Sequence, residues 1–69
     1  MEKGYKLYLQ CIDEWREAVR IYADEEVPVT IYADNIDDAM VKVIQQTRGI
    51  KLNGMHKLVC NKTGEFKIF

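Results

Sequence analysis

Residues 34–49 read DNIDDAMVKVIQQTRG, the most strongly patterned segment of the chain. Its apolar side chains recur with the 3.6-residue period of an amphipathic helix. The stripe runs through Ile36, Ala39, Met40, Val43 and Ile44 and continues at Thr47. Asp34 or Asn35 can accept a hydrogen bond from a free N–H of the first turn, and Gly49 can adopt the left-handed conformation that ends many helices. The pattern predicts a helix from about Asn35 to Arg48.

Charges at the two ends of this segment agree with a helix dipole. Asp37 and Asp38 fall in the first turn, where negative charge is favoured, and Arg48 falls in the last turn, where positive charge is favoured. A helix with a single apolar stripe buries that stripe against another layer of structure. A sheet is therefore expected beside it.

Four segments outside the helix supply strands. Residues 5–11 alternate, with Tyr5, Leu7, Leu9 and Cys11 on one face, and residues 27–33 alternate in the same way. Pro28 cannot donate to a ladder and belongs at a strand start or on an edge. Residues 57–61 and 65–69 flank Lys62-Thr63-Gly64, which is a hairpin signal. Residues 49–56 are expected to form a loop.

Residues 14–26 fit two structures. A helical stripe runs through Trp15, Ala18, Val19, Tyr22 and Ala23, whereas a strand would place Val19, Ile21 and Ala23 inward. Asp24-Glu25-Glu26 would crowd the negative end of a helix dipole, and Ile21-Tyr22-Ala23-Asp24 recurs in the predicted strand as residues 31–34. These points favour a strand. The predicted fold is a small α+β domain, an antiparallel-rich sheet with one helix on one face, in the order β-β-β-α-β-β; the alternative is β-α-β-α-β-β.

The two faces of this sheet differ in character. The buried face is expected to carry Leu7, Leu9, Cys11, Val19, Ile21, Val29 and Ile31. The opposite face is expected to carry Lys6, Tyr8, Gln10, Arg16, Arg20, Tyr22, Thr30 and Tyr32. Tyr and Arg are enriched at the energetic centres of protein interfaces, and the same mixture can stack bases and hold phosphates. The candidate binding residues are Lys6, Tyr8, Arg16, Arg20, Tyr22 and Tyr32.

Length and composition narrow the class of protein. A chain of 69 residues, 48% hydrophobic and 30% charged, predicts a single globular domain spanning residues 1–69. No run approaches the length of a membrane span, and no apolar signal core follows the N-terminus. We therefore expect a cytoplasmic protein, with Cys11 and Cys60 as free thiols and a disulfide between them as the disfavoured alternative.

Charge is unevenly distributed along the chain. Residues 1–38 hold four basic and ten acidic side chains, a net −6, and residues 39–69 hold six basic and one acidic, a net +5. Such a split can mark a charged partner, but two halves that pack together would intermix their charges, which is the interpretation we favour. The overall charge of −1 and the lack of a basic run argue against nucleic acid.

Catalytic and metal-binding patterns are weak. The chain has no serine, and its one histidine, His56, forms His-x-x-x-Cys with Cys60. Together with Cys11 that makes three zinc ligands, where a structural site uses four. Asp37 and Asp38 are adjacent on a helix and diverge by about 100°. No Gly-rich phosphate loop is present. We expect no enzyme activity, no metal and no cofactor.

The leading functional hypothesis is a non-catalytic protein-binding module: an adaptor, inhibitor or regulatory subunit, of the kind found among phage and mobile-element accessory proteins. A homodimer is one form of this hypothesis, because a small core gains from added buried area. The first alternative is single-stranded nucleic-acid binding through Tyr8, Tyr22, Tyr32, Arg16 and Arg20. The second is an acidic mimic of nucleic acid that uses Glu14, Glu17, Asp24, Glu25, Asp37 and Asp38.

Overall fold

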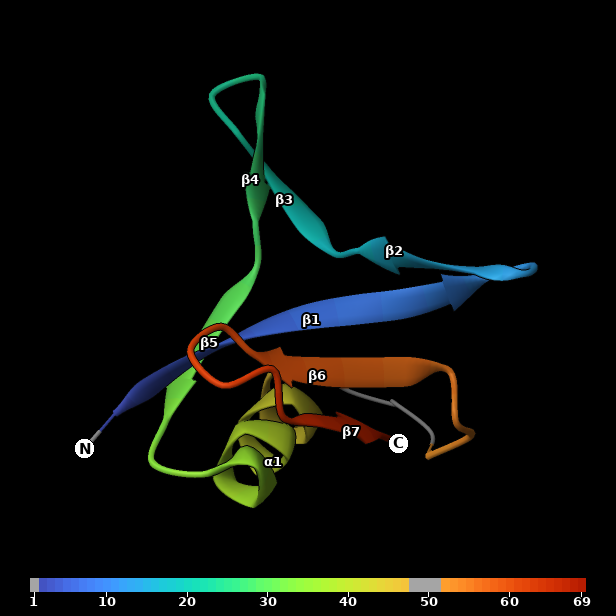
Figure 1. Ribbon diagram of the computed structural model, residues 1–69. Helices are drawn as coiled ribbons and strands as arrows, with labels where there is room; N and C mark the ends of the chain where they lie inside the picture. Colours follow the sequence, from blue (N-terminus) through green and yellow to red (C-terminus); the bar gives the residue numbers. More distant parts are fainter. Residues whose placement is uncertain (1, 48–51) are drawn as a thin grey trace.

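The computed structural model describes residues 2–47 and 52–69. In chain order the elements are β1 (Lys3–Cys11), β2 (Glu14–Glu17), β3 (Val19–Tyr22), β4 (Glu25–Pro28), β5 (Thr30–Ala33), α1 (Ile36–Gln46), β6 (His56–Cys60) and β7 (Phe66–Ile68) (Figure 1). The described strand pairs are antiparallel. The predicted α+β class, with one helix packed on an antiparallel sheet, is confirmed.

Strand β1 organises the main, five-stranded sheet. On one side it pairs with β6, which pairs in turn with β7. On its other side it pairs with β5 along residues 3–6 and with β2 along residues 8–11. The change of partner falls at Leu7, whose carbonyl accepts a hydrogen bond of 2.8 Å from the Ala18 N–H. Two strands therefore share one edge of β1, and the chain between them must leave the sheet.

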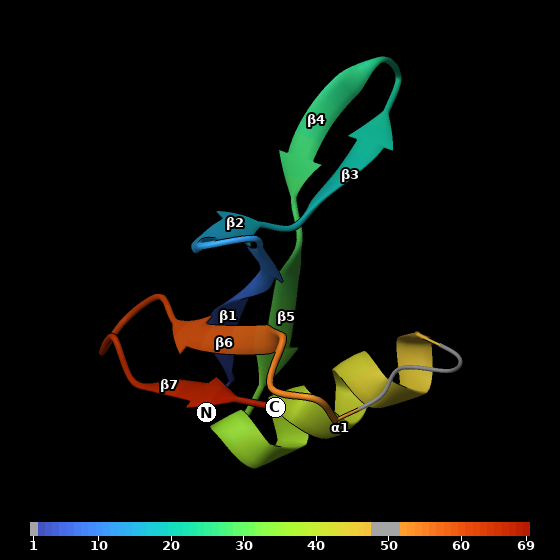
Figure 2. The ribbon, with the colours of Figure 1, turned by 90° about the vertical axis from the view of Figure 1, so that its right-hand side faces the viewer.

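That chain forms a second, two-stranded sheet, β3–β4, which we call the arm (Val19–Pro28). Its base is joined by a 2.9 Å hydrogen bond from the Val29 N–H to the Ala18 carbonyl. Its tip turns through Ala23 and Asp24, which have φ values of 50° and 66°, the backbone of a tight two-residue hairpin turn. Figures 1 and 2 both show the arm projecting from one end of the molecule, with α1 at the other.

The arm corrects two details of the sequence prediction. Of residues 15–23, all but Ala18 and Ala23 are strand rather than helix. Ala18 divides β2 from β3, Ala23 begins the turn at the arm tip, and Val29 divides β4 from β5. The prediction that Val19 and Ile21 line the buried sheet face is wrong, since they are 43% and 69% exposed. They lie beyond Ala18, where the chain has already left the main sheet.

The core lies between α1 and the main sheet. Its buried members are Tyr5, Ile31, Ala33, Ala39, Val43, Leu58, Cys60 and Phe69. Tyr5 is the cross-strand partner of both Ile31 and Cys60, which places it at the centre of the packed face. The expected burial of Leu9 and Cys11 is wrong, because both are exposed on the end of β1 that runs past α1 (Figure 1).

Helix α1 begins as its sequence predicts. The Asn35 side chain accepts a 2.9 Å hydrogen bond from the Asp38 N–H, as an N-cap residue does. The helix ends at Gln46, and the Thr47 N–H reaches the Val43 carbonyl at 3.0 Å. Arg48 and Gly49, expected to close the helix, and the first residues of the predicted 49–56 loop lie outside the described residues. Among the described ranges, no helix has the length and apolar character needed to cross a membrane.

Candidate binding face

The sheet face opposite α1 is the first candidate site, and strand register defines its members. Directly opposed residues of antiparallel strands project from the same face. Tyr8 opposes Glu17 and Lys57, and Val59 opposes Phe66. Extending these pairs across the sheet identifies the residues that project from the face opposite α1, which we call the outer face. It comprises Lys6, Tyr8, Gln10, Trp15, Glu17, Thr30, Tyr32, Lys57, Val59, Phe66 and Ile68.

Lys57 lies at the centre of the outer face, among three aromatic rings from three other strands. Its Nζ is 4.9 Å from the centroid of the Trp15 ring, 5.5 Å from that of Tyr8 and 5.9 Å from that of Phe66. An ammonium within about 6 Å of an aromatic centroid is attracted to the ring quadrupole, with roughly 0.5–1 kcal/mol gained at an exposed site. The three rings and the cation thus form one cluster spanning β1, β2, β6 and β7.

Large apolar side chains continue this cluster towards the β7 edge. Phe66 is 62% exposed and Ile68 48% exposed, although they oppose the half-buried residues Val59 and Lys57 across the strand pair. Contiguous exposed apolar surface is uncommon on proteins that act alone, and it marks interaction sites. At the opposite edge, Tyr32 is 58% exposed. The outer face therefore offers aromatic and aliphatic contact area around one central cation, Lys57.

The structure brings together three of the six residues selected from sequence. Lys6, Tyr8 and Tyr32 lie on the outer face, where Lys6 Nζ is 3.4 Å from the Glu17 carboxylate. Arg16 is on the other face of the sheet, because it opposes Leu9, and its Nε lies 2.7 Å from the Glu14 carboxylate. Arg20 and Tyr22 are on the arm.

Sequence reasoning missed Trp15, Lys57 and Phe66. Trp15 lies on the outer face because the two-residue Ile12-Asp13 loop aligns it with Gln10, and no local sequence pattern marks that loop. Phe66 would have followed from the register of the predicted 57–69 hairpin. Both assignments require the hairpin register, which the alternation of apolar residues alone does not specify.

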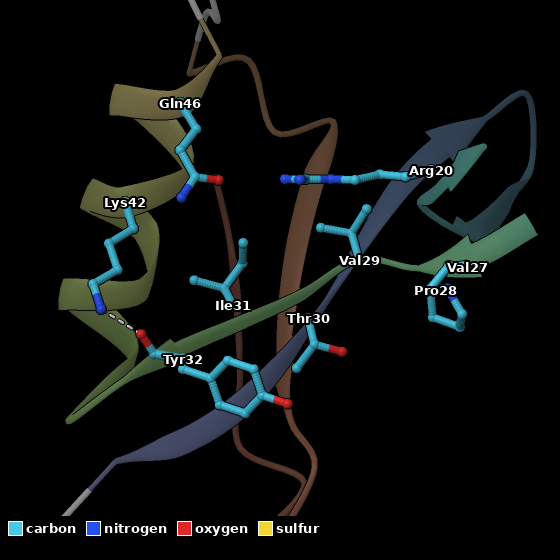
Figure 3. A pocket seen from close by; sticks show the side chains of 9 residues that line it. All are labelled: Arg20, Val27, Pro28, Val29, Thr30, Ile31, Tyr32, Lys42 and Gln46. Carbon is cyan, nitrogen blue, oxygen red and sulfur yellow. Dashed lines mark hydrogen bonds between the residues drawn. The ribbon is translucent and has the colours of Figure 1, made fainter. Parts of the chain in front are cut away.

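A cleft lies between the arm, β5 and α1. It has a volume of about 700 Å³ and is lined by Arg20, Val27, Pro28, Val29, Thr30, Ile31, Tyr32, Lys42 and Gln46. Figure 3 shows Arg20 of the arm and Gln46 of α1 reaching towards each other across it. Lys42 donates a hydrogen bond to the Tyr32 carbonyl on β5. The described residues that line the cleft include two cations and no carboxylate.

The residues considered for metal or nucleophile chemistry lie apart. His56 stacks on Phe69, with ring centroids 5.5 Å apart, and Cys60 is four residues further along the same strand, about 13 Å away at strand spacing. Hydrogen bonds from the side chain and backbone of Thr63 lower the pKa of the buried Cys60 thiol. Cys11 is exposed at the far end of β1, and both thiols are free. Within residues 2–47 and 52–69, no cluster of three or more His, Cys, Asp or Glu side chains is arranged to hold a metal.

The acidic side chains do not share one surface. Glu14 is paired with Arg16, Glu17 with Lys6, and Asp37 with Lys67. Asp24 and Glu25 are at the arm tip, which lies at the opposite end of the molecule from α1 (Figures 1 and 2). A mimic of nucleic acid would require these charges to follow one line, as phosphates do.

Comparison with known proteins yields no relative. No family model, curated protein or solved structure matches this chain.

Proposed function

We propose that this protein is a non-catalytic protein-binding module that contacts its partner through the outer face. The observation that carries the proposal is the cluster of Tyr8, Trp15 and Phe66 around Lys57. In this proposal the protein acts as an adaptor, inhibitor or regulatory subunit in the cytoplasm, where its two thiols stay reduced.

Two properties of the outer face support a protein partner. Energetic centres of interfaces are enriched in Trp and Tyr and are surrounded by contacts that exclude water. Trp15, Tyr8 and Lys57 are half-buried already, so they lose little conformational freedom on binding, and this lowers the entropic cost of association. Phe66 and Ile68 extend the apolar area at the rim.

Affinity capture with matched variants tests the proposal. Tagged wild-type protein is compared with Phe66→Ser, which removes an exposed ring, and with Ile21→Ser, which removes an exposed apolar side chain from the arm. We expect a captured protein to be lost with Phe66→Ser and kept with Ile21→Ser. The captured protein is then purified, and its affinity for wild type should exceed that for Phe66→Ser by at least about tenfold, or 1.4 kcal/mol. Equal affinities would reject the outer face as the contact.

Single-stranded nucleic acid is the second candidate, and one observation favours it. Tyr8 and Trp15 flank Lys57, and Lys6 opposes Val59 on the same face, so stacking rings and cations occur together as they do in single-strand binders. Fluorescence anisotropy with a labelled oligothymidylate at low salt tests it. Binding that weakens with added salt and with Tyr8→Ala supports nucleic acid, whereas no anisotropy change with any amount of protein rejects it.

A further inference from the structure

The arm forms a sheet of its own, separate from the main sheet. Among the described residues, strands β3 and β4 pair only with each other, and all eight of their residues are exposed. Four of these are large apolar side chains: Val19, Ile21, Tyr22 and Val27, with exposures of 43%, 69%, 76% and 42%. An isolated two-stranded hairpin is marginally stable in water. A surface that covers the arm would therefore stabilise it.

Charge on the arm is ordered along its length. Arg20 opposes Val27, and Tyr22 opposes Glu25, so these four side chains share one face. Arg20 and Val27 line the cleft, which identifies this as the cleft side of the arm. Positive charge lies near the base, where Lys42 of α1 adds a second cation. Negative charge lies at the tip, where Glu25 follows Asp24 in the turn.

We infer that two copies of this protein form a dimer in which the arm of each lies in the cleft of the other. In a two-fold dimer the same patch serves both copies and runs in opposite directions. The base of one arm then meets the tip of the other, so Arg20 faces Glu25 of the second copy and Lys42 faces the second copy's acidic turn. Val27, which pairs with Arg20, and Tyr22, which pairs with Glu25, lie beside these charges and supply apolar contact area.

The charge order favours a second copy over an unrelated partner. A patch that carries positive charge at one end and negative charge at the other is complementary to itself when it is reversed. This dimer uses the arm and the cleft, whose lining shares only Thr30 and Tyr32 with the outer face. It leaves the cluster of Tyr8, Trp15 and Phe66 around Lys57 open, so it stands independently of the proposed function.

Charge reversal in trans tests the dimer. Sedimentation velocity of the full chain gives the oligomeric state of wild type, Arg20→Glu, Glu25→Arg and an equimolar mixture of the two variants. We expect wild type to be a dimer and each single variant to be a monomer. In a dimer of either variant, both of the equivalent contacts between positions 20 and 25 would bring two like charges together. In the mixture the two substituted positions face each other with opposite charges, and the native Arg20 of one copy faces the native Glu25 of the other. The dimer should therefore return.

Matched controls distinguish this dimer from a general response to altered charge. Lys62→Glu changes the charge equally on an exposed residue of the β6–β7 turn and should leave the dimer intact. Circular dichroism confirms that each variant is folded. A monomeric wild type at several hundred micromolar, a dimer that persists in both single variants, or a mixture that stays monomeric would each overturn the inference.

Discussion

The Nζ atom of Lys57 lies 4.9 Å from the centroid of the Trp15 ring, although the two residues are 42 positions apart in the chain. The contact exists because β1 pairs with β2 on one side and with β6 on the other, so Trp15 and Lys57 flank the same strand. It defines the centre of the outer face, and its energetic contribution can be measured.

Replacing the cation should weaken the fold measurably. Lys57→Ala removes an ammonium close to three rings and an aliphatic stem that covers them, so we expect a loss of roughly 1 kcal/mol in the free energy of unfolding. Urea denaturation followed by fluorescence of the single tryptophan measures this. Lys62→Ala, on an exposed turn, is the control; equal urea midpoints for the two variants would contradict the cluster.

Tyr5 predicts a loss of stability at high pH. Burial of the phenol raises its pKa above the usual 10.0, so the folded state disfavours the phenolate. The stability linked to Tyr5 is therefore fully present below pH 10 and is lost as the pH rises from 10 through the folded-state pKa. Tyr5→Phe should show a smaller fall in urea midpoint between pH 8 and pH 11 than wild type does.

The same substitution has a predicted effect at neutral pH. The Tyr5 hydroxyl is buried without a hydrogen-bond partner among the described residues, and an unpaired buried polar group is unfavourable. Tyr5→Phe should therefore keep or raise the urea midpoint at pH 7. A lower midpoint at pH 7 would mean that the hydroxyl is paired in solution.

Ile12 is held in an unfavourable backbone conformation. It is the first residue of the two-residue loop between β1 and β2, with φ of 58° and 88% exposure. A β-branched residue rarely adopts this region, whereas glycine does so freely. Ile12→Gly should raise the free energy of unfolding by about 1 kcal/mol. Asp13→Gly, at the loop position without a positive φ, is the control and should lower it; the opposite order would refute the assigned loop geometry.

The two cysteines should differ sharply in reactivity. Cys11 is exposed and Cys60 is buried, and a reagent must reach the thiolate whatever the pKa of the thiol. With iodoacetamide at pH 8 we expect one rapid alkylation per native chain and a second only in urea. Cys11→Ser should abolish the rapid reaction. Two rapid reactions in the native wild type would contradict the burial of Cys60.

The helix and the strand segments could be predicted because their signals are local. Asn35 accepts its hydrogen bond three residues away, and the α1 stripe that buries Ala39 and Val43 lies within three turns. The hairpin at residues 57–69 was likewise marked by a short glycine-containing turn. Such features depend on neighbours in the chain, which a single sequence displays directly.

The candidate site depended on information that local patterns do not carry. Trp15 reaches the outer face because Ile12 adopts a conformation that β-branched residues rarely take, so the residue type gave no hint of the tight loop. Val19 and Ile21 were expected in the core because alternation predicts one buried face. Their exposure follows from the exit of the chain at Ala18, where β5 replaces β2 beside β1.

Site-specific photo-crosslinking can establish whether the outer face is the protein contact. A benzophenone side chain is placed at position 66 on the outer face and, as a matched control, at exposed position 45 on α1, and cells that express the protein are irradiated. We predict a light-dependent adduct with a second protein from position 66 and none from position 45. An adduct from position 45 with none from position 66 would contradict the assignment of the outer face as the contact.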